Sequence, residues 1–192
     1  GDNIGAGSSG DSTFLLAEAV KHGASSWLQT VRDTEAIDVC VAAGIGSTVT
    51  VNVGGKTDSL HGEPVQLTGR VTRMSDGRFE DTGTVHAGWR FFDAGPTVMI
   101  ESEEGPTVAL VTSRVGNMSR EQFYSLGYRP DDFDIVVAKG VVSPRPAYQP
   151  IASEMITVNT PGATSADMST FEYKRVRESL YPLDLNAEYV HD

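Results

Sequence analysis

The residues best suited to chemistry stand at the start of the chain, in the glycine-rich segment GDNIGAGSSGD. Gly5, Gly7 and Gly10 form a G-x-G-x-x-G pattern before a predicted helix, and Asp33 follows about 20 residues later, as in a dinucleotide-binding fingerprint. That fingerprint must follow an apolar strand, and residues 1–4 do not have the sequence of one. Dinucleotide binding is therefore the least favoured interpretation of this loop.

The same loop allows two other interpretations. Backbone N–H groups at a helix N-terminus bind anions, whereas the carboxylates of Asp2 and Asp11 would suit a cation or an amine. Residues 6–10 also resemble a degenerate nucleophile elbow, but an elbow sits between a strand and a helix. Because neither His61 nor His86 can be assigned as the partner of a serine, a serine hydrolase is disfavoured.

A second candidate is the loop GGKTDSLHG. Its two glycines, Gly54 and Gly55, permit close backbone approach, and Lys56, Asp58 and His61 would place a cation, a carboxylate and an imidazole at one rim. Loops with this mixture often carry function. A solvated turn with a structural aspartate explains the pattern equally well.

Two basic residues follow apolar strand candidates. Arg114 comes after the strand predicted over 108–112, and Lys139 comes after the one predicted over 135–138. Ligands of open α/β sheets bind at the carboxyl ends of parallel strands. Each side chain is placed to pair with a substrate carboxylate, and a surface salt bridge is the alternative for each.

The four histidines do not form a metal site by their spacing. His22, His61, His86 and His191 make no H-x-H, H-x-x-x-H or H-E-x-x-H pair, and Cys40 is the single cysteine. The position of Cys40 on the apolar face of a helix predicts a core residue. We therefore expect no complete zinc site within this chain.

The helices and strands that must position these residues are predicted from the spacing of apolar residues, which alternates along the chain between helical and extended periodicity. Helices are predicted from Asp11 or Ser12 to Lys21 and from Asp33 to Ala43, the second with Ala36, Ile37, Cys40 and Val41 on its apolar face. A short strand at 26–31 lies between them. A short helix ending at Leu126 comes later in the chain.

The middle of the chain is rich in strand signals. Strands are predicted near 49–53, 65–71, 85–92, 98–101 and 108–112, and later at 135–138 and 155–158. Short apolar strands separated by helices indicate parallel strands covered on both faces. We therefore predict one α/β domain over 1–192, a mixed sheet with short parallel strands covered by helices and a β-rich antiparallel insertion over about 47–112.

The composition of the chain argues against two classes of partner, nucleic acids and membranes. The chain has 192 residues and a net charge of −11, from 15 Lys plus Arg against 26 Asp plus Glu, so it lacks the basic stripe that nucleic acids require. No apolar run approaches the roughly 20 residues that span a bilayer. We expect neither a nucleic-acid nor a membrane partner, and a cytoplasmic location.

Several motifs, in order, resemble the C-terminal domain of the microcystinase C (MlrC) family of zinc metallopeptidases. They are DNIGAGSSGDST, GGKTDSLHG, the DGRF turn, VTSRV, VVAKG and the closing YPLD, which together cover about Asp2 to Asp184. The family loop usually reads DNPGGGAPGD, so Asp2, Asn3, Gly10 and Asp11 carry over while Ile4 replaces the proline. The second motif carries over as Gly54, Gly55, Lys56, Thr57, Asp58, His61 and Gly62.

One departure lies after the late strand. Where the family commonly has K-S-x-x-H-F-R, this chain has Lys139 and Gly140, followed by Ser143, Pro144 and Arg145. The family histidine is missing. Lys139 and Arg145 are retained, and we expect basic recognition to persist through them.

The resemblance implies a division of labour. It places the zinc ligands in a larger N-terminal domain outside this chain, and it makes this domain a lining of the cleft in which a linear peptide or other small amide is hydrolysed. The expected cleft residues are Asp2, Asn3, Asp11, Lys56, Asp58, His61, Arg114, Lys139 and Arg145. No catalytic or metal residue is expected here, and the domain alone should be inactive. A free-standing small-molecule or anion-binding module is the alternative.

Overall fold

The computed structural model describes residues 1–177 and 179–188. Its centre is a six-stranded sheet in the order β2-β3-β6-β7-β1-β8. Strand β1 pairs in parallel with β7 on one side and β8 on the other, and the remaining neighbours are antiparallel. The strands are β1 Trp27–Arg32, β2 Thr48–Val53, β3 Val65–Ser75, β6 Thr97–Ser102, β7 Thr107–Val111 and β8 Ile135–Val137.

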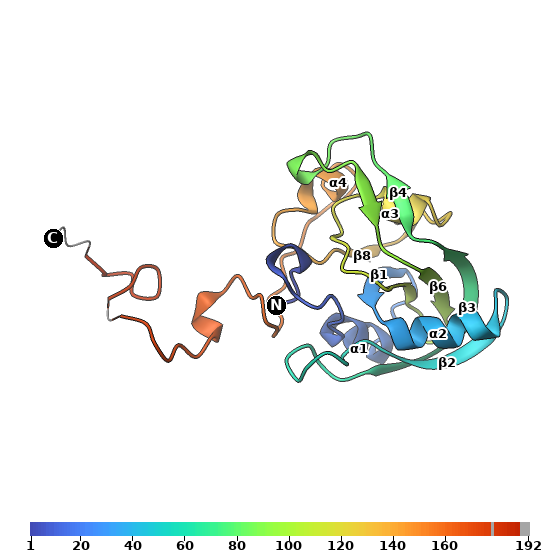
Figure 1. Cartoon of the computed structure of the whole chain (residues 1–192), viewed down its shortest axis with the longest axis horizontal. Coiled ribbons are helices and arrows are strands. Elements are labelled where there is room, and N and C mark those ends of the chain that lie inside the picture. Colours follow the sequence, from blue (N-terminus) through green and yellow to red (C-terminus); the bar gives the residue numbers. More distant parts are fainter. Residues whose placement is uncertain (178, 189–192) are drawn as a thin grey trace.

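Helices cover both faces of this sheet (Figure 1). Helices α1 (Phe14–Lys21) and α2 (Thr34–Ala43) pack on one face, in a cluster that includes Leu16, Ile37 and Cys40. Helices α3 (Glu121–Tyr124) and α4 (Arg145–Tyr148) pack on the other through Phe123 and Tyr148. Alternate residues of a strand point to opposite faces, so Met99 joins the second cluster while Val98 and Ile100 join the first. The predicted α/β class is confirmed.

The β-rich middle section is confirmed, but one of its predicted strands is wrong. Residues 85–92 form the 3-10 turn η2 (His86–Gly88) followed by β5 (Phe91–Asp93). Strand β5 pairs with β4 (Arg78–Glu80) in a separate two-stranded ribbon. The chain turns here because Ala87 and Gly88 both adopt a positive φ, which no strand accommodates. Three further 3-10 turns are η1 Ile4–Ala6, η3 Pro130–Asp132 and η4 Met168–Thr170.

The start of α2 agrees with the sequence prediction, whereas the N-cap of α1 does not. The N-cap of α2 is Asp33, whose carboxylate accepts the Ala36 N–H at 3.0 Å, close to the predicted start. The N-cap of α1 is Thr13, so the prediction of Asp11 or Ser12 as its cap is wrong. The carboxylate of Asp11 is engaged by another loop. Val41, predicted to face the core, is exposed instead.

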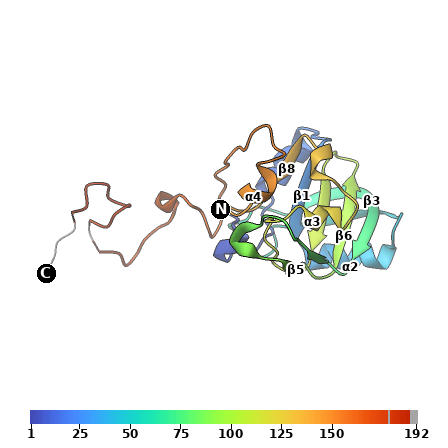
Figure 2. The ribbon, with the colours of Figure 1, turned by 90° about the horizontal axis from the view of Figure 1, so that it is seen from above.

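The predicted strand at 155–158 is also wrong. These residues have no strand partner, and Ile156 and Val158 are exposed to solvent. They belong to a long C-terminal segment that passes beside the N-terminal loop and then leaves the body of the protein, as two perpendicular views show (Figures 1 and 2). In the described part of the chain, no helix is long and apolar enough to cross a membrane.

Candidate functional site

Three loops distant in sequence meet at one edge of the sheet. They are the glycine-rich loop, the loop between β2 and β3, and the loop that follows β8. Strands β1, β7 and β8 are parallel, so their carboxyl ends share this edge. The glycine-rich loop crosses it, where the Arg32 N–H donates to the Gly10 carbonyl at 3.0 Å. The loop between β2 and β3 joins from the side, with the Gly55 N–H donating to the Asp11 carbonyl at 2.8 Å. This is the crevice position typical of ligand sites in open α/β sheets.

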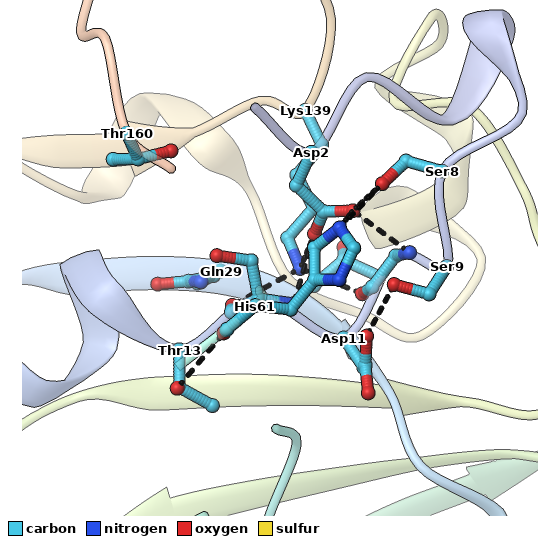
Figure 3. A network of polar contacts seen from close by, with 12 residues as sticks. Asp2, Ser8, Ser9, Asp11, Thr13, Gln29, His61, Lys139 and Thr160 are labelled. Atoms are coloured by element: carbon cyan, nitrogen blue, oxygen red, sulfur yellow. Dashed lines mark hydrogen bonds and ion pairs between the residues drawn. The ribbon is translucent and has the colours of Figure 1, made fainter. Parts of the chain in front are cut away.

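Asp2 is the centre of the resulting polar network (Figure 3). Its Oδ1 accepts the Ser8 hydroxyl at 2.7 Å and the Gly10 N–H at 2.9 Å, and its Oδ2 accepts the Ser12 N–H at 2.9 Å. Burial works against the charged carboxylate, but the Lys139 ammonium and these donors outweigh it and lower the pKa of Asp2 to about 2. The glycine-rich loop is thus folded around its own carboxylate.

Lys139 lies beneath the loop, at the end of β8. Its Nζ is 2.9 Å from Asp2 Oδ2 and donates to the carbonyls of Gly10 at 2.6 Å and Ser12 at 3.4 Å. Burial lowers the pKa of this ammonium, and the attraction of Asp2 and Asp11 opposes that effect. Three acceptors match the three N–H bonds of an ammonium. A substrate carboxylate would have to replace one of them.

Asp11 joins the glycine-rich loop to the β2–β3 loop. Its Oδ2 accepts the N–H groups of Lys56 at 3.0 Å and Thr57 at 2.9 Å, and its Oδ1 accepts the Ser9 hydroxyl. Burial disfavours the carboxylate, yet these hydrogen bonds keep the pKa of Asp11 below its usual range. Asp11 therefore orders the lysine loop rather than a helix terminus.

Lys56 turns back toward α2. Its ammonium contacts Asp33 Oδ2 at 3.0 Å and Glu35 Oε2 at 3.1 Å. Partial burial works against the charge, but these carboxylates raise the pKa of Lys56. Asp33 also accepts the Gly54 N–H at 2.7 Å. Its carboxylate is therefore already bonded within the protein and is not free to bind a ribose. The dinucleotide interpretation of Asp33 has no support in this arrangement.

His61 connects an exposed carboxylate with the buried network. Its Nδ1 lies 2.7 Å from Asp58 Oδ1, and its Nε2 lies 2.9 Å from Ser8 Oγ and 3.9 Å from Asp2 Oδ1. The Leu60 N–H and the imidazole hold the pKa of Asp58 below its usual range. Asp58, His61 and Ser8 thus have the connectivity of a Ser-His-Asp triad.

Burial argues against a nucleophilic role for Ser8. Ser8 and His61 are each only 1% exposed, and the Ala163 N–H contacts His61 Nε2 at 3.5 Å. Ser8 has a single hydroxyl proton, for which Asp2 competes with His61. A substrate carbonyl cannot reach the Ser8 hydroxyl in this arrangement, so the three residues form an internal hydrogen-bond chain.

The glycines of the β2–β3 loop make its close packing possible. A Cβ at Gly54 would lie 2.5 Å from the Asp11 carbonyl oxygen, and one at Gly62 would lie 2.5 Å from Thr13 Oγ1. Both glycines also have a positive φ. This is the close backbone approach that the glycine-rich sequence of this loop predicts.

The remaining candidates lie around the network. The Asn3 N–H donates to Thr164 Oγ1 at 2.9 Å. The backbone carbonyl of Asn3 accepts the Ala6 and Ser8 N–H groups. Arg114 is exposed, with Nη1 3.4 Å from the Gly7 carbonyl. The Arg145 side chain, at the start of α4, makes no hydrogen bond or ion pair with the other candidates among residues 1–177 and 179–188.

Comparisons with known proteins identify the family of this chain. The family described as MlrC C-terminus matches residues 1–175, nearly the whole chain. The chain belongs to the MlrC C-terminus family. No curated protein matches the sequence.

A solved structure resembles this MlrC C-terminal chain throughout. It is the crystal structure of a protein from Mesorhizobium sp. BNC1 that is described as a candidate metallopeptidase. The two share 26% sequence identity with a TM-score of 0.81, over 96% of this chain and 36% of the other. The present chain therefore spans about a third of the length of that protein.

The described residues of this MlrC C-terminal chain do not form a zinc site. Within the described residues, no group of three or more His, Cys, Asp or Glu side chains is arranged to hold a metal ion. The buried carboxylates already accept hydrogen bonds from their own loops. His191, one of the four histidines considered from sequence, lies outside the described residues.

Sequence reasoning missed three participants of the network. The sequence suggests Ser8 and Ser9 only as parts of an elbow, and Asp33 as a helix start or part of a dinucleotide fingerprint, whereas all three also hold the loops together. Polar residues that recur between glycines in a loop are a weak signal for such packing. Apart from local contacts, their partners are 21 to 53 residues away in the chain, so spacing does not reveal them.

Proposed function

We propose that this chain is the C-terminal domain of an MlrC-like zinc metallopeptidase, in which it lines the substrate cleft and packs on an N-terminal domain that carries the metal. The observation that carries the proposal is the family match over residues 1–175, joined to a metallopeptidase-like structure of which the chain covers 36%. The described residues lack a metal-binding group, which fits a metal held elsewhere in the enzyme. The reaction we propose is hydrolysis of a linear peptide or other small amide.

Burial divides the candidate residues into two groups. Asp58 and Arg114 keep exposed polar atoms at the carboxyl edge of the sheet, and Lys56 is partly exposed. These three are the residues that we propose contact substrate or the neighbouring domain. A guanidinium such as that of Arg114 suits a peptide carboxylate.

The second group supports the first. Asp2, Asp11, His61 and Lys139 are buried and bonded to each other or to the loop backbone, so we propose that they fix the shape of the cleft wall. Asn3 ties the same loop to residue 164. Arg145 stands apart, and we propose it only as a domain contact.

The proposal is tested by joining the chain to its metal-bearing domain and assaying linear peptides with zinc. We expect cleavage that requires both parts and stops when a chelator is added. Asp58→Asn and Arg114→Ala should lower turnover about tenfold without lowering zinc content, as expected for loss of one charged hydrogen bond. Glu18→Gln, an exposed carboxylate on α1, is the matched control and should have no effect. Cleavage by this chain alone that survives the chelator would refute the proposal.

The alternative, a free-standing anion-binding module, has weaker support. The Gly10 and Ser12 N–H groups of the glycine-rich loop already bind the Asp2 carboxylate. The amine that this carboxylate holds is that of Lys139. A phosphate or carboxylate ligand would therefore have to displace the loop's own anion. Titration of the isolated chain with phosphate, followed by calorimetry, should show no binding.

A further inference from the structure

The C-terminal segment contains an arm, residues 165–177 and 179–188, that contacts little of the body. The last hydrogen bonds to the body are made by Ala163 and Thr164, to His61, Gly1 and Asn3. Beyond them, the hydrogen bonds of the described arm stay within the C-terminal segment, as between Asn159 and Asp167. Figures 1 and 2 show the arm leading away from the sheet in both views.

The arm is rich in side chains that favour a partner. Phe171 and Tyr173 pack edge to face, with ring centroids 6.4 Å apart. Large apolar and aromatic side chains exposed along the arm are Met168, Tyr173, Val176, Tyr181 and Leu185. Segments that remain unfolded are poor in aromatic residues. A row of exposed aromatic and aliphatic groups instead marks an interaction surface.

The basic side chains of the arm are concentrated in one stretch, although the described arm as a whole carries more acidic than basic residues. Residues 171–177 read FEYKRVR, with Lys174, Arg175 and Arg177 against Glu172, in a protein of net charge −11. A basic and aromatic stretch of this kind complements a surface that combines acidic side chains with apolar hollows. Arg and Tyr are also the residues most often found at the centre of protein interfaces.

The comparisons suggest which surface this is. The family match continues to residue 175, well inside the arm, although the arm does not pack on the body. The match to the Mesorhizobium structure covers 96% of this chain, which leaves out too few residues to exclude the whole arm. About two thirds of that longer chain lies outside the match. Part of the arm thus falls inside the match to a protein that carries a second large part in the same chain.

We infer that the arm is a docking element that binds the metal-bearing domain of the same enzyme. Its aromatic and aliphatic side chains fill apolar hollows there, and Lys174, Arg175 and Arg177 face acidic side chains. Because the segment just before the arm contacts the glycine-rich loop at Asn3 and the β2–β3 loop at His61, docking also fixes the candidate site against that domain. The inference rests on the proposed function for the identity of the partner.

The test compares amide hydrogen exchange in two proteins, the intact enzyme and the present chain alone. We expect exchange in residues 165–177 to be at least about tenfold slower in the intact enzyme, because docking protects amides that are open in the isolated chain. Tyr173→Ser with Val176→Ser, and separately Arg175→Glu with Arg177→Glu, should abolish this protection. The charge variant should lose more at low ionic strength than at high ionic strength.

Control variants separate docking from folding. Val39→Ser and Ile45→Ser change exposed apolar residues at and just after α2, and they should leave exchange in the arm unchanged. The arm variants should leave the Tm of the isolated chain unchanged, since the arm does not pack on its body.

The outcomes distinguish this inference from the proposed function. An intact enzyme that cleaves peptides with zinc while its arm exchanges as fast as in the isolated chain overturns the inference alone. A protected arm in a protein without peptidase activity leaves the inference standing and removes the proposed function. Protection that rises with protein concentration and follows a dimer in light scattering would identify a second copy as the partner and overturn the inference.

Discussion

The ammonium of Lys139 lies 2.9 Å from Asp2 Oδ2, and both side chains are almost fully buried, with 5% and 6% exposed. This pair links the end of β8 to the first turn of the glycine-rich loop, across most of the chain length. Buried ion pairs add little net stability over apolar residues, but the loss of one partner leaves the other charge uncompensated. We therefore expect the stability of the candidate site to be sensitive to substitution of either residue.

Asp2→Asn should lower the free energy of unfolding by about 3 to 5 kcal/mol, because it leaves the Lys139 charge buried without a counterion. Adding Lys139→Met should restore part of the loss. Urea unfolding with the midpoint followed by circular dichroism measures both. The exposed pair of Glu18 and Lys21 is the matched control, since Glu18→Gln removes only a solvent-screened contact and should leave the unfolding midpoint unchanged. A double variant less stable than Asp2→Asn alone would contradict this account.

Stability should fall in acid through the same carboxylate. The pKa of Asp2 in the folded protein is about 2, below the ordinary value of 3.8, so folding favours the ionised form. The stabilisation is complete above the ordinary pKa and is lost as the pH falls through the folded one, and the difference amounts to about 2 kcal/mol. The Tm measured from pH 5 to pH 2 should drop most between pH 4 and pH 2. Asp2→Asn should flatten this part of the curve, and an equally steep drop in the variant would assign the effect to other carboxylates.

How far the sequence predicts this site depends on the range of the interactions. The hydrophobic periods predicted both long helices and the alternation of β2, because those patterns are local. They also placed Arg114 and Lys139 after strands that prove to be parallel neighbours of β1. The family motifs identified the two loops that meet at this edge.

The roles within those loops were not predictable, for a physical reason. A carboxylate before a helix is a good cap by its sequence, yet Asp11 instead accepts N–H groups of Lys56 and Thr57, about 45 residues away. Such a choice depends on which loops the tertiary fold brings together. The strand predicted at 155–158 failed similarly, since its apolar residues have no strand to pair with.

Gly54→Ala should be far more destabilising than Gly7→Ala. Both glycines have a positive φ, so both variants carry the same backbone strain of about 1 kcal/mol. A Cβ at Gly54 also meets the Asp11 carbonyl oxygen at 2.5 Å, whereas one at Gly7 meets nothing within 4 Å. We expect an additional loss of about 2 kcal/mol or more at Gly54, as for overpacking of a core. Chemical denaturation of the two variants measures the difference, and equal losses would show that the loops separate easily.

Cys40 should resist alkylation in the folded protein. The thiol is fully buried in the main core cluster, and burial raises its pKa to about 11, with Asp33 adding to the effect. Since only the thiolate reacts, iodoacetamide at pH 8 should modify it only after unfolding. Mass spectrometry across a urea titration should show labelling that follows the unfolding midpoint. Rapid labelling without urea would mean that α2 opens locally.

Ser8 should remain unreactive toward a fluorophosphonate probe, despite its contact with His61. The hydroxyl is 1% exposed and also donates to the Asp2 carboxylate, so a phosphorus centre has neither access nor a free nucleophile. Intact-mass measurement after incubation of the native chain at pH 8 should show no adduct, and Ser8→Ala should give the same spectrum. An adduct that Ser8→Ala removes and Ser9→Ala retains would show that the Asp58, His61 and Ser8 chain acts as a catalytic triad. The buried loop would then be a second catalytic centre, separate from the metal.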